Sequence, residues 1–372
     1  MDIIINFFLD AGNIVVYYLI PFIIVLGIMI FFHELGHFLV AKFFGIKVLK
    51  FALGFGPKIA AKDVGETEYS VRYVPLGGFV KMLGEDDEDE ESEGLTPEDA
   101  KRAFNKQHPL KRIAIVAAGP FFNLVLALFL FYGLFLISGT YIRTPEIGQV
   151  IDDSPAQRAG LKVGDIIISV QDNEVQSLGD FKEMIQDQAG NPILITVKRE
   201  EKVLSMTVIP EESLTENEFG EEVKSALIGI LDAGKYEHLK MGPFKALKES
   251  LIETWNWIKL TCLVVVKLFQ GVLSIKTVGG PIAIGQMTGE LAKESPGTLV
   301  PFMAVISVNL AILNLFPIPI LDGGVIIFLL IELIIGRPMS IRKREMAQKI
   351  GLSLLLILVV IVFYNDILRL FQ

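Results

Sequence analysis

Cysteine is almost absent from this sequence, because Cys262 is the only one among 372 residues. A single thiol excludes an internal disulfide and a cluster of thiolates around a metal ion. Histidine is scarce too, with four residues, so any metal site must combine imidazoles with carboxylates. Lysine and arginine number 34 against 43 acidic residues, and no nucleic-acid partner is expected.

The excess negative charge is concentrated in one segment. Ten acidic residues fall between Glu85 and Asp99, in EDDEDEESEGLTPED. Such a run is expected to be a solvated, flexible loop without a specific ligand, and a basic partner is the alternative.

Apolar residues are abundant. They make up 52% of the chain, and the mean hydropathy of +0.52 exceeds what a soluble domain needs to fill its core. Four runs are close to the length that a bilayer requires and predict transmembrane helices: 14–44, 113–137, 299–316 and 350–370. The first run lacks a preceding basic region and a following cleavage site, so we expect it to be retained. Residues 325–335 are too few to cross and are expected at the interface or against the bundle.

Two further features bear on topology. Residues 243–276 contain WNWIKLTCLVVVKLF with recurring lysines, which favours a helix in the membrane plane over a fifth crossing. The loops after the first and third predicted spans carry the basic residues, so the positive-inside rule predicts both to be cytoplasmic. The N-terminus and residues 138–298 are then outside. A fifth crossing would break this agreement.

The external segment predicts a small domain. Strands are expected at 147–151, 193–198 and 203–209, and a helix at 181–188. The string SPAQRAGLKVGDIIISV resembles a circularly permuted bacterial PDZ domain. PDZ domains bind peptide ends by adding a strand. The alternative is a spacer that only blocks access.

The chemistry is concentrated in HELGH, where His33 and His37 are four residues apart and share one face of a helix. Both imidazoles can therefore bind one zinc ion, and Glu34 can act on water at an open position. A chance pattern or hydrogen-bonded core histidines are the alternatives. Within a membrane helix each ionisable group costs about 2.5–3.5 kcal/mol on insertion scales, which favours a bound cation.

Catalytic zinc usually takes a third protein ligand, and Asp322 is the best candidate. Pro317 and Pro319 prevent regular helix before it, so we expect Asp322 on irregular backbone at membrane depth. The first and third predicted spans both run inward, which brings Asp322 towards the histidines. A simple helix cap is the alternative role.

Four features together resemble the site-2 protease family, specifically its bacterial branch of regulators of sigma-E: HELGH, GPFFN at 119–123, the PDZ-like insert and NLFPIPILDGG at 314–324. The resemblance implies that His33, His37 and Asp322 bind zinc and that Glu34 is the general base. It also implies that four residues contact substrate: Asn309, Asn314, Pro317 and Pro319. The chain departs from the family pattern by having one PDZ-like segment and Val325 in place of a frequent histidine.

Residues 51–57 and 67–82 predict strands with glycine turns, and the family has a membrane-associated β hairpin or sheet here. Its glycines are Gly54, Gly56, Gly77 and Gly78. Such strands can pair with an unwound substrate segment or simply pack under the bundle. Asn309 and Asn314 can likewise hydrogen-bond substrate or tie helices together.

We therefore predict a polytopic α-helical membrane protein with four transmembrane helices, a membrane-associated β hairpin and an inserted extracytoplasmic PDZ domain. The predicted divisions are the first helix with HELGH (1–45), hairpin and acidic loop (46–112), second helix (113–140), PDZ domain with a trailing strand (141–232), interfacial helix (243–280), third helix and LDGG loop (298–336), and basic loop with fourth helix (337–372).

The predicted activity is zinc-dependent hydrolysis of peptide bonds within transmembrane segments, in the lipid of the bacterial plasma (inner) membrane. Expected substrates are single-pass membrane proteins already cut on the outer side, such as anti-sigma factors or remnant signal peptides. One alternative is an inactive PDZ scaffold. Another is an ion transporter that uses the same four ionisable residues as a relay, although no inverted repeat is evident.

Overall fold

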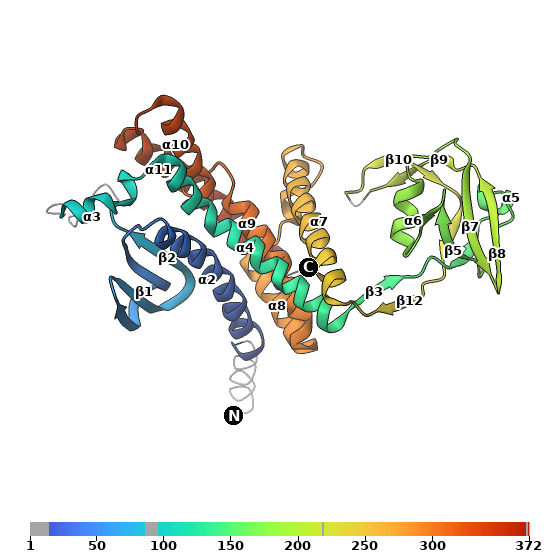
Figure 1. Cartoon of the computed structure of the whole chain (residues 1–372), viewed down its shortest axis with the longest axis horizontal. Coiled ribbons are helices and arrows are strands. Elements are labelled where there is room, and N and C mark those ends of the chain that lie inside the picture. The colour runs from blue at the N-terminus through green and yellow to red at the C-terminus, as the bar shows by residue number, and fades with distance from the viewer. Residues whose placement is uncertain (1–14, 86–95, 218, 370, 372) are drawn as a thin grey trace. The chain divides into compact units, whose positions relative to one another are not determined.

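The computed structural model describes residues 15–85, 96–217, 219–369 and 371. The chain divides into two compact units (Figure 1). The helical unit comprises Met1–Leu134 and Leu247–Gln372, and the inserted domain comprises Phe135–Ala246. Most of the predicted acidic loop lies outside the described residues.

Three helices in the described part of the helical unit are long and apolar enough to cross a membrane: Val15–Phe43, Pro109–Ser138 and Arg342–Arg369. The first consists of a short π-helix, Val15–Leu19, followed by α2, Ile20–Phe43, which has a proline in its first turn. The second is α4, Pro109–Ser138, and the third belongs to α11, Ile341–Arg369. These helices match three predicted spans, although α11 begins well before the predicted start at residue 350.

The third predicted span is broken. Helix α9, Leu299–Asn314, has 16 residues and therefore rises only ~24 Å, less than the hydrocarbon core. A short irregular segment with Pro317 and Pro319 follows, and α10, Asp322–Ile335, then continues for 14 residues. The prediction that Asp322 lies on irregular backbone is wrong by one residue, because the irregular segment ends at Leu321. As predicted, part of 325–335 packs against the bundle, since Leu329 is buried beside Ile115 and Val116.

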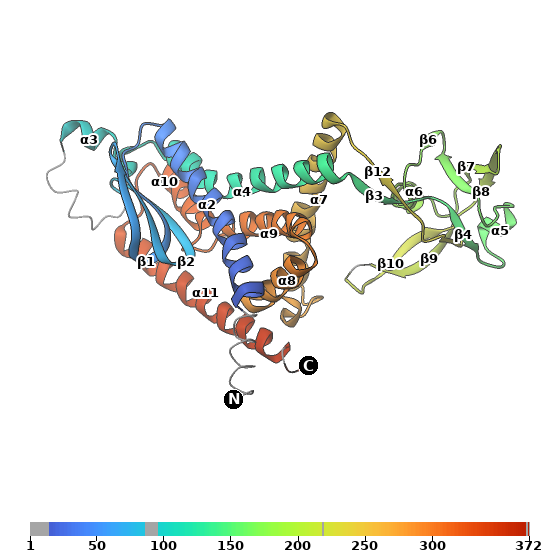
Figure 2. The same cartoon turned by 90° about the horizontal axis from the view of Figure 1, so that it is seen from below.

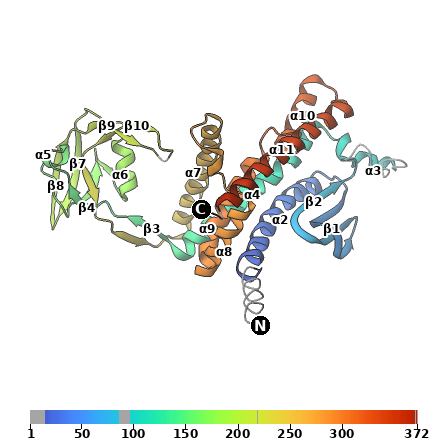
Figure 3. The same ribbon diagram turned by 180° about the vertical axis from the view of Figure 1, so that it is seen from behind.

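This unit also contains the short helix α3, Pro97–Lys101, and two longer helices, α7 and α8. Helix α7, Pro243–Phe269, covers most of the segment predicted to be amphipathic and is not among the described helices apolar enough to span. Helix α8, Pro281–Glu294, was not predicted. Its first turn is capped by the buried Asp366 of α11, whose carboxylate accepts hydrogen bonds from three backbone N–H groups of residues 280, 282 and 283. Figure 3 shows the end of α11 beside α8.

A long hairpin packs beside α2 (Figure 2). Strand β1 is Val48–Val64 and β2 is Thr67–Met82. The second strand has its predicted bounds, whereas the first extends beyond the predicted 51–57 at both ends. Residues 50–53 of β1 have partners at both 68–71 and 78–81, so the hairpin folds back on itself. The turn residue Glu66 accepts hydrogen bonds from both Arg102 and Lys42, which fixes this turn near the end of α2.

The inserted domain is built on a four-stranded sheet in the order β6-β5-β7-β8. Its elements are β3 Thr140–Arg143, β4 Ile147–Val150, α5 Pro155–Arg158, β5 Ile166–Val170, β6 Asn173–Glu174, α6 Leu178–Ile185, β7 Ile193–Arg199, β8 Lys202–Val208, β9 Glu211–Glu216, β10 Glu222–Leu227, β11 Ile230–Asp232 and β12 Tyr236–Leu239. The strands predicted around 147, 193 and 203 are present, and the predicted helix begins three residues earlier, at Leu178.

The domain continues past its predicted hairpin. Strands β9 and β10 pair with each other, β11 pairs with β4, and β12 pairs with β3. Alternation of polar and apolar residues is weak in these short strands, which is why the sequence indicated only a trailing strand. The β3–β12 pairing brings the two ends of the insert together, since Thr144 N donates to Lys235 O at 3.0 Å.

Candidate metal centre

His33 and His37 occupy successive turns of α2 and point the same way, as residues four apart on a helix do. Their Nε2 atoms lie 3.2 Å apart, and their rings are nearly perpendicular, at 86°. Ligand atoms held about 2 Å from one tetrahedral zinc ion lie about 3.3 Å apart, so this separation suits a shared ion.

Asp322, at the start of α10, supplies the third group. Its Oδ2 lies 3.2 Å from His33 Nε2 and 3.7 Å from His37 Nε2. Potential ligand atoms of the three side chains all fall within 4.8 Å of one another. Oδ2 is buried and has no hydrogen-bond partner in the described chain, although a buried carboxylate oxygen requires compensation. A cation between this oxygen and the two nitrogens supplies that compensation, so the residues present fit zinc.

Glu34 lies between the two histidines in sequence and faces the hairpin. A Cβ built at Gly78 of β2 would lie 2.9 Å from Glu34 Cγ. The glycine therefore lets the strand approach the carboxylate closely. This places an extended backbone directly beside the candidate general base.

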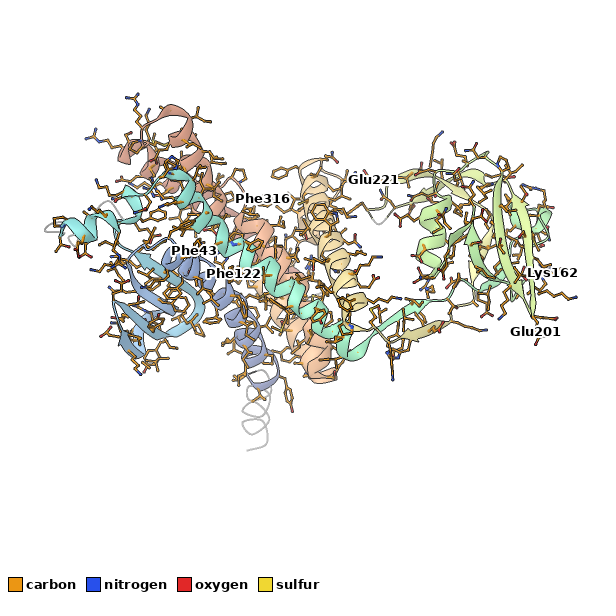
Figure 4. All side chains as sticks on the ribbon, viewed as in Figure 1. Phe43, Phe122, Lys162, Glu201, Glu221 and Phe316 are labelled. Atoms are coloured by element: carbon orange, nitrogen blue, oxygen red, sulfur yellow. The ribbon has the colours of Figure 1, made fainter. Side chains whose placement is uncertain are left out.

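Helix α4 orients both imidazoles from the other side. The carbonyl oxygen of Ile115 lies 2.9 Å from His37 Nδ1, which can donate to it and so leaves Nε2 available to a metal. Gly119 makes room for the rings, because a Cβ there would lie 2.2 Å from His37 Nε2. A Cβ at Gly36 of α2 would lie 2.3 Å from the Ala118 carbonyl oxygen and 3.0 Å from Cβ of Phe122, which is labelled in Figure 4.

Asn123 is fully buried and lies against His33. Its amide nitrogen is 3.3 Å from His33 Nδ1, and its amide oxygen has no hydrogen-bond partner in the described chain. A neutral histidine bound to metal through Nε2 carries its proton on Nδ1 and needs an acceptor there. The two ends of an amide are assigned from the hydrogen bonds they make, so the turned amide, with its oxygen on Nδ1, fits this site.

The four predicted substrate contacts of the third span are divided by the structure. The amide nitrogen of Asn314 lies 3.5 Å from His33 Nδ1, at the centre. Asn309 instead accepts a hydrogen bond from Thr261 of α7 at 2.7 Å, so its amide ties two helices together. Pro317 and Pro319 lie in the break between α9 and α10, where they keep the backbone out of regular helix.

The hairpin glycines also differ in position. Gly54 and Gly77 line a cavity of about 430 Å³ between α2 and the hairpin, with Ile28 and Phe31 of α2 on its other wall. Gly56 has φ +83°, a conformation that favours glycine, and does not line the cavity. Gly78 is the one against Glu34.

Three supporting positions were missed by sequence reasoning: the Ile115 carbonyl, Gly119 and the Asn123 side chain. The GPFFN motif held the signal for two of them, because a glycine and an asparagine four residues apart lie on the same face of α4. A backbone carbonyl has no signal in a sequence.

A helix with two histidines and an intervening glutamate, completed by a distant aspartate among apolar helices, defines a metal-dependent peptidase embedded in a membrane. Comparison with known proteins agrees. Residues 21–358 match the model of Peptidase family M50, and the chain belongs to this family, the site-2 proteases.

Several bacterial relatives match almost the whole chain. A protein of Mesorhizobium japonicum is 37% identical over 359 residues, 94% of this chain and 98% of that protein. One of Clostridium perfringens is 37% identical over 353 residues, again 94% and 98%, and one of Agrobacterium fabrum is 33% identical over 371 residues, 97% and 98%. Each of the three is named "putative zinc metalloprotease".

One solved structure, the PDZ domain of an SdrC-like protein from Listeria monocytogenes, covers 24% of this chain and 85% of its own, at 24% identity and a TM-score of 0.19. That score carries no argument about the fold. The family and its relatives make this chain an intramembrane zinc metalloprotease.

Proposed function

We propose that this protease hydrolyses peptide bonds within transmembrane segments of single-pass membrane proteins that have already been cut on the outer side. His33, His37 and Asp322 hold the zinc ion, and Glu34 is the general base. The observation that carries the proposal is the convergence of two imidazole nitrogens and a carboxylate oxygen without a hydrogen-bond partner within 4.8 Å, with both histidines in a helix long and apolar enough to cross a membrane.

The chain's own residues account for the proton transfers. When bound, zinc supplies Lewis acidity, polarising the scissile carbonyl and lowering the pKa of water. Glu34 takes a proton from the attacking water as its oxygen bonds to the carbonyl carbon. The carboxylic acid then passes that proton to the amide nitrogen as the C–N bond breaks. One water is consumed, and Glu34 ends as it began.

The hairpin would present the substrate in an extended form. A peptide bond inside a helix is shielded, so a transmembrane segment must unwind before water can attack it. The close approach of β2 to Glu34 at Gly78 and the apolar cavity along α2 support pairing of the unwound segment with this strand.

The inserted domain is proposed to be a PDZ domain on the outer side of the bacterial plasma (inner) membrane, as in the sigma-E regulator branch. Its four-stranded sheet and single longer helix support the first point, and the basic residues in the loops after the first and third predicted spans support the second. Tags near Glu88 and Ser340 should report the cytoplasm, and a tag near Ser177 the outside. A cytoplasmic signal from Ser177 would contradict this topology.

The metal assignment is tested by Asp322→Asn, with Asp366→Asn as a matched control. Both aspartates lie in helices of the helical unit, but Asp366 caps α8 and is not part of the candidate metal centre. In detergent, Asp322→Asn should lose zinc and cleavage of a transmembrane reporter, whereas Asp366→Asn should retain zinc. Wild-type zinc content and rate in Asp322→Asn would mean that another residue is the third ligand.

The role of the inserted domain is tested by excising residues 145–234. Because Thr144 and Lys235 are hydrogen-bonded neighbours, a short glycine bridge can join them and keep the β3–β12 pairing. If the domain excludes substrates with bulky outer domains, the shortened enzyme should cut an intact substrate in cells that lack the protease responsible for the preceding cut on the outer side. If it binds zinc and cuts only the pre-cleaved form, the domain recruits a peptide end.

A further inference from the structure

Arg112 and Glu332 form an ion pair between α4 and α10 that the chemistry above does not use. Arg112 Nη1 lies 3.0 Å from each carboxylate oxygen of Glu332. The side chains are 8% and 16% exposed, and the guanidinium carbon lies 5.1 Å from the ring centre of Phe104. The charges are therefore largely removed from water. In this environment the attraction between them is stronger than in water, and packing fixes their geometry.

The two helices lead from this pair directly to the metal centre. Arg112 is three residues before Ile115, whose carbonyl oxygen lies beside His37 Nδ1. Glu332 is in the same helix as Asp322, ten residues later, a rise of ~15 Å. The pair thus joins the helix that orients His37 to the far end of the helix that begins with Asp322.

Helix α10 is held near both ends. At its start, a Cβ at Gly323 or Gly324 would lie 2.2 Å from the carbonyl oxygen of Leu315 or Ile318, so these turns fit closely against the break. Near its other end, Glu332 ties α10 to α4 through the ion pair. Leu329, between them, packs in one buried cluster with Ile115. A short helix fixed at both ends cannot pivot, and releasing the far end would change the direction in which Asp322 points.

We propose that Arg112 and Glu332 are positioning residues for the metal centre: their ion pair fixes α10 against α4 and so holds Asp322 within reach of His33 and His37. The proposal rests on the proposed zinc ligands. Stability alone does not require an ion pair at this position, since a buried ion pair can often be replaced by apolar side chains without loss of stability. A role in positioning Asp322 is therefore a separate claim.

The experiment measures zinc affinity of the full-length chain in detergent, by competition with a chromophoric chelator. Glu332→Ala should weaken zinc binding, by at most the loss of about 10–100-fold that is typical when a group hydrogen-bonded directly to a metal ligand is removed. Arg112→Lys, which keeps the charge, should retain most of the affinity. The exchanged pair Arg112→Glu with Glu332→Arg should recover most of what either single change loses. Asp165→Asn breaks a buried ion pair in the inserted domain and should leave zinc affinity unchanged.

A distance measurement provides the second readout. Spin labels can be attached to cysteines introduced at Leu110 of α4 and Ile335 of α10, which are 55% and 60% exposed, after Cys262 is replaced by serine. The distance distribution should broaden in Glu332→Ala and narrow again in the exchanged pair. A stability role without positioning would lower the melting temperature and leave the distribution and the zinc affinity of the folded protein unchanged.

Wild-type zinc affinity in folded Glu332→Ala would overturn the proposal. If that variant does not fold, the exchanged pair decides: it must bind zinc far better than Arg112→Glu alone, and equal affinities would count against positioning. The failure of this proposal can be distinguished from the failure of the proposed function. Normal zinc content in Asp322→Asn would contradict the proposed zinc ligands, whereas normal zinc affinity in the Glu332 variants would contradict only the role of the Arg112–Glu332 pair.

Discussion

The helical unit and the inserted domain both bury apolar side chains, but most of the buried polar side chains of the described residues lie in the helical unit. In the helical unit the described residues that are fully buried or nearly so include Asn123, Ser307 and Asp366, all making hydrogen bonds between helices. In the inserted domain the buried core is apolar around Phe181, and Asp165 is the chief buried charge, paired with Arg199. Figure 4 places Lys162 and Glu201 together at one end of this domain and Glu221 well away from them.

The difference follows from the surroundings of each unit. In the inserted domain, the hydrophobic effect drives apolar side chains out of water and into one core. Helices in lipid gain little from apolar contact with each other, because the lipid tails are equally apolar. Hydrogen bonds between polar groups and close contacts at small residues therefore determine how the helices pack. The metal centre uses the same features, with Gly119 and Asn123 beside the histidines. Changes in the two units should therefore have separable effects.

The largest expected effect is that of Glu34→Gln on cleavage. The amide cannot accept the proton of water, so the rate should fall at least about 10²–10⁴-fold, the usual contribution of a general base. Zinc should be retained, because His33, His37 and Asp322 remain. Rate assays on a reporter segment and zinc analysis of the same sample check both. Normal turnover would remove Glu34 from its role.

The next effect belongs to the other unit. Phe181→Ala removes a ring that is 1% exposed and should destabilise the inserted domain by about 3–5 kcal/mol. Hydrogen exchange of residues 147–208 would show this. Zinc affinity and cleavage of a pre-cut substrate should remain unchanged. A loss of zinc would break the comparison, because the two units would then not be separable.

A smaller effect is expected at Asn123. Asn123→Leu removes the amide that lies against His33 Nδ1 and that, when turned, accepts its hydrogen bond, so this change should weaken zinc binding about 10–100-fold. Asn123→Asp keeps an acceptor and should bind zinc more tightly than Asn123→Leu does. Equal zinc affinities of the two variants would mean that Asn123 contributes packing and no hydrogen bond to His33.

The smallest effect concerns the hairpin turn. Hydrogen bonds from Arg102, then Lys42, lower the pKa of Glu66 to about 2, despite some opposition from burial. A lowered pKa adds stability above the unfolded value of 4.5, and this stability is lost as pH falls towards 2. Because the group is largely open to solvent, we expect only about 0.2–1 kcal/mol.

Melting temperatures of the wild type and Glu66→Gln, compared from pH 6 to pH 2, test this. The wild type should be slightly more stable at pH 6, and the two should converge near pH 2. A constant difference across this range would show that the charge of Glu66 is not responsible.

Sequence patterns predicted the parts of this molecule that depend on local spacing. His33 and His37 share a helical face because they are four residues apart, and apolar length identified α2, α4 and α11. The proline-rich segment before Asp322 and the direction of the predicted spans indicated this residue, and the site-2 resemblance implied the same one; the structure brings it to the histidines. The ligand roles of these residues remain predictions until the metal is located.

What the sequence did not predict depends on contacts between distant segments. Helix α8 is short and of mixed polarity, and its cap comes from Asp366, more than eighty residues away. The length of α9 was overestimated, since the apolar run continues through Phe316 into the break. The role of Asn309 could not be chosen in advance, because its partner Thr261 lies on another helix.

The most direct test is to locate zinc by anomalous scattering from crystals of the full-length protein with its native metal. The account predicts one strong peak between His33 Nε2, His37 Nε2 and Asp322 Oδ2, and no such peak in Asp322→Asn. A peak elsewhere, or one at the histidines completed by a different residue, would contradict it.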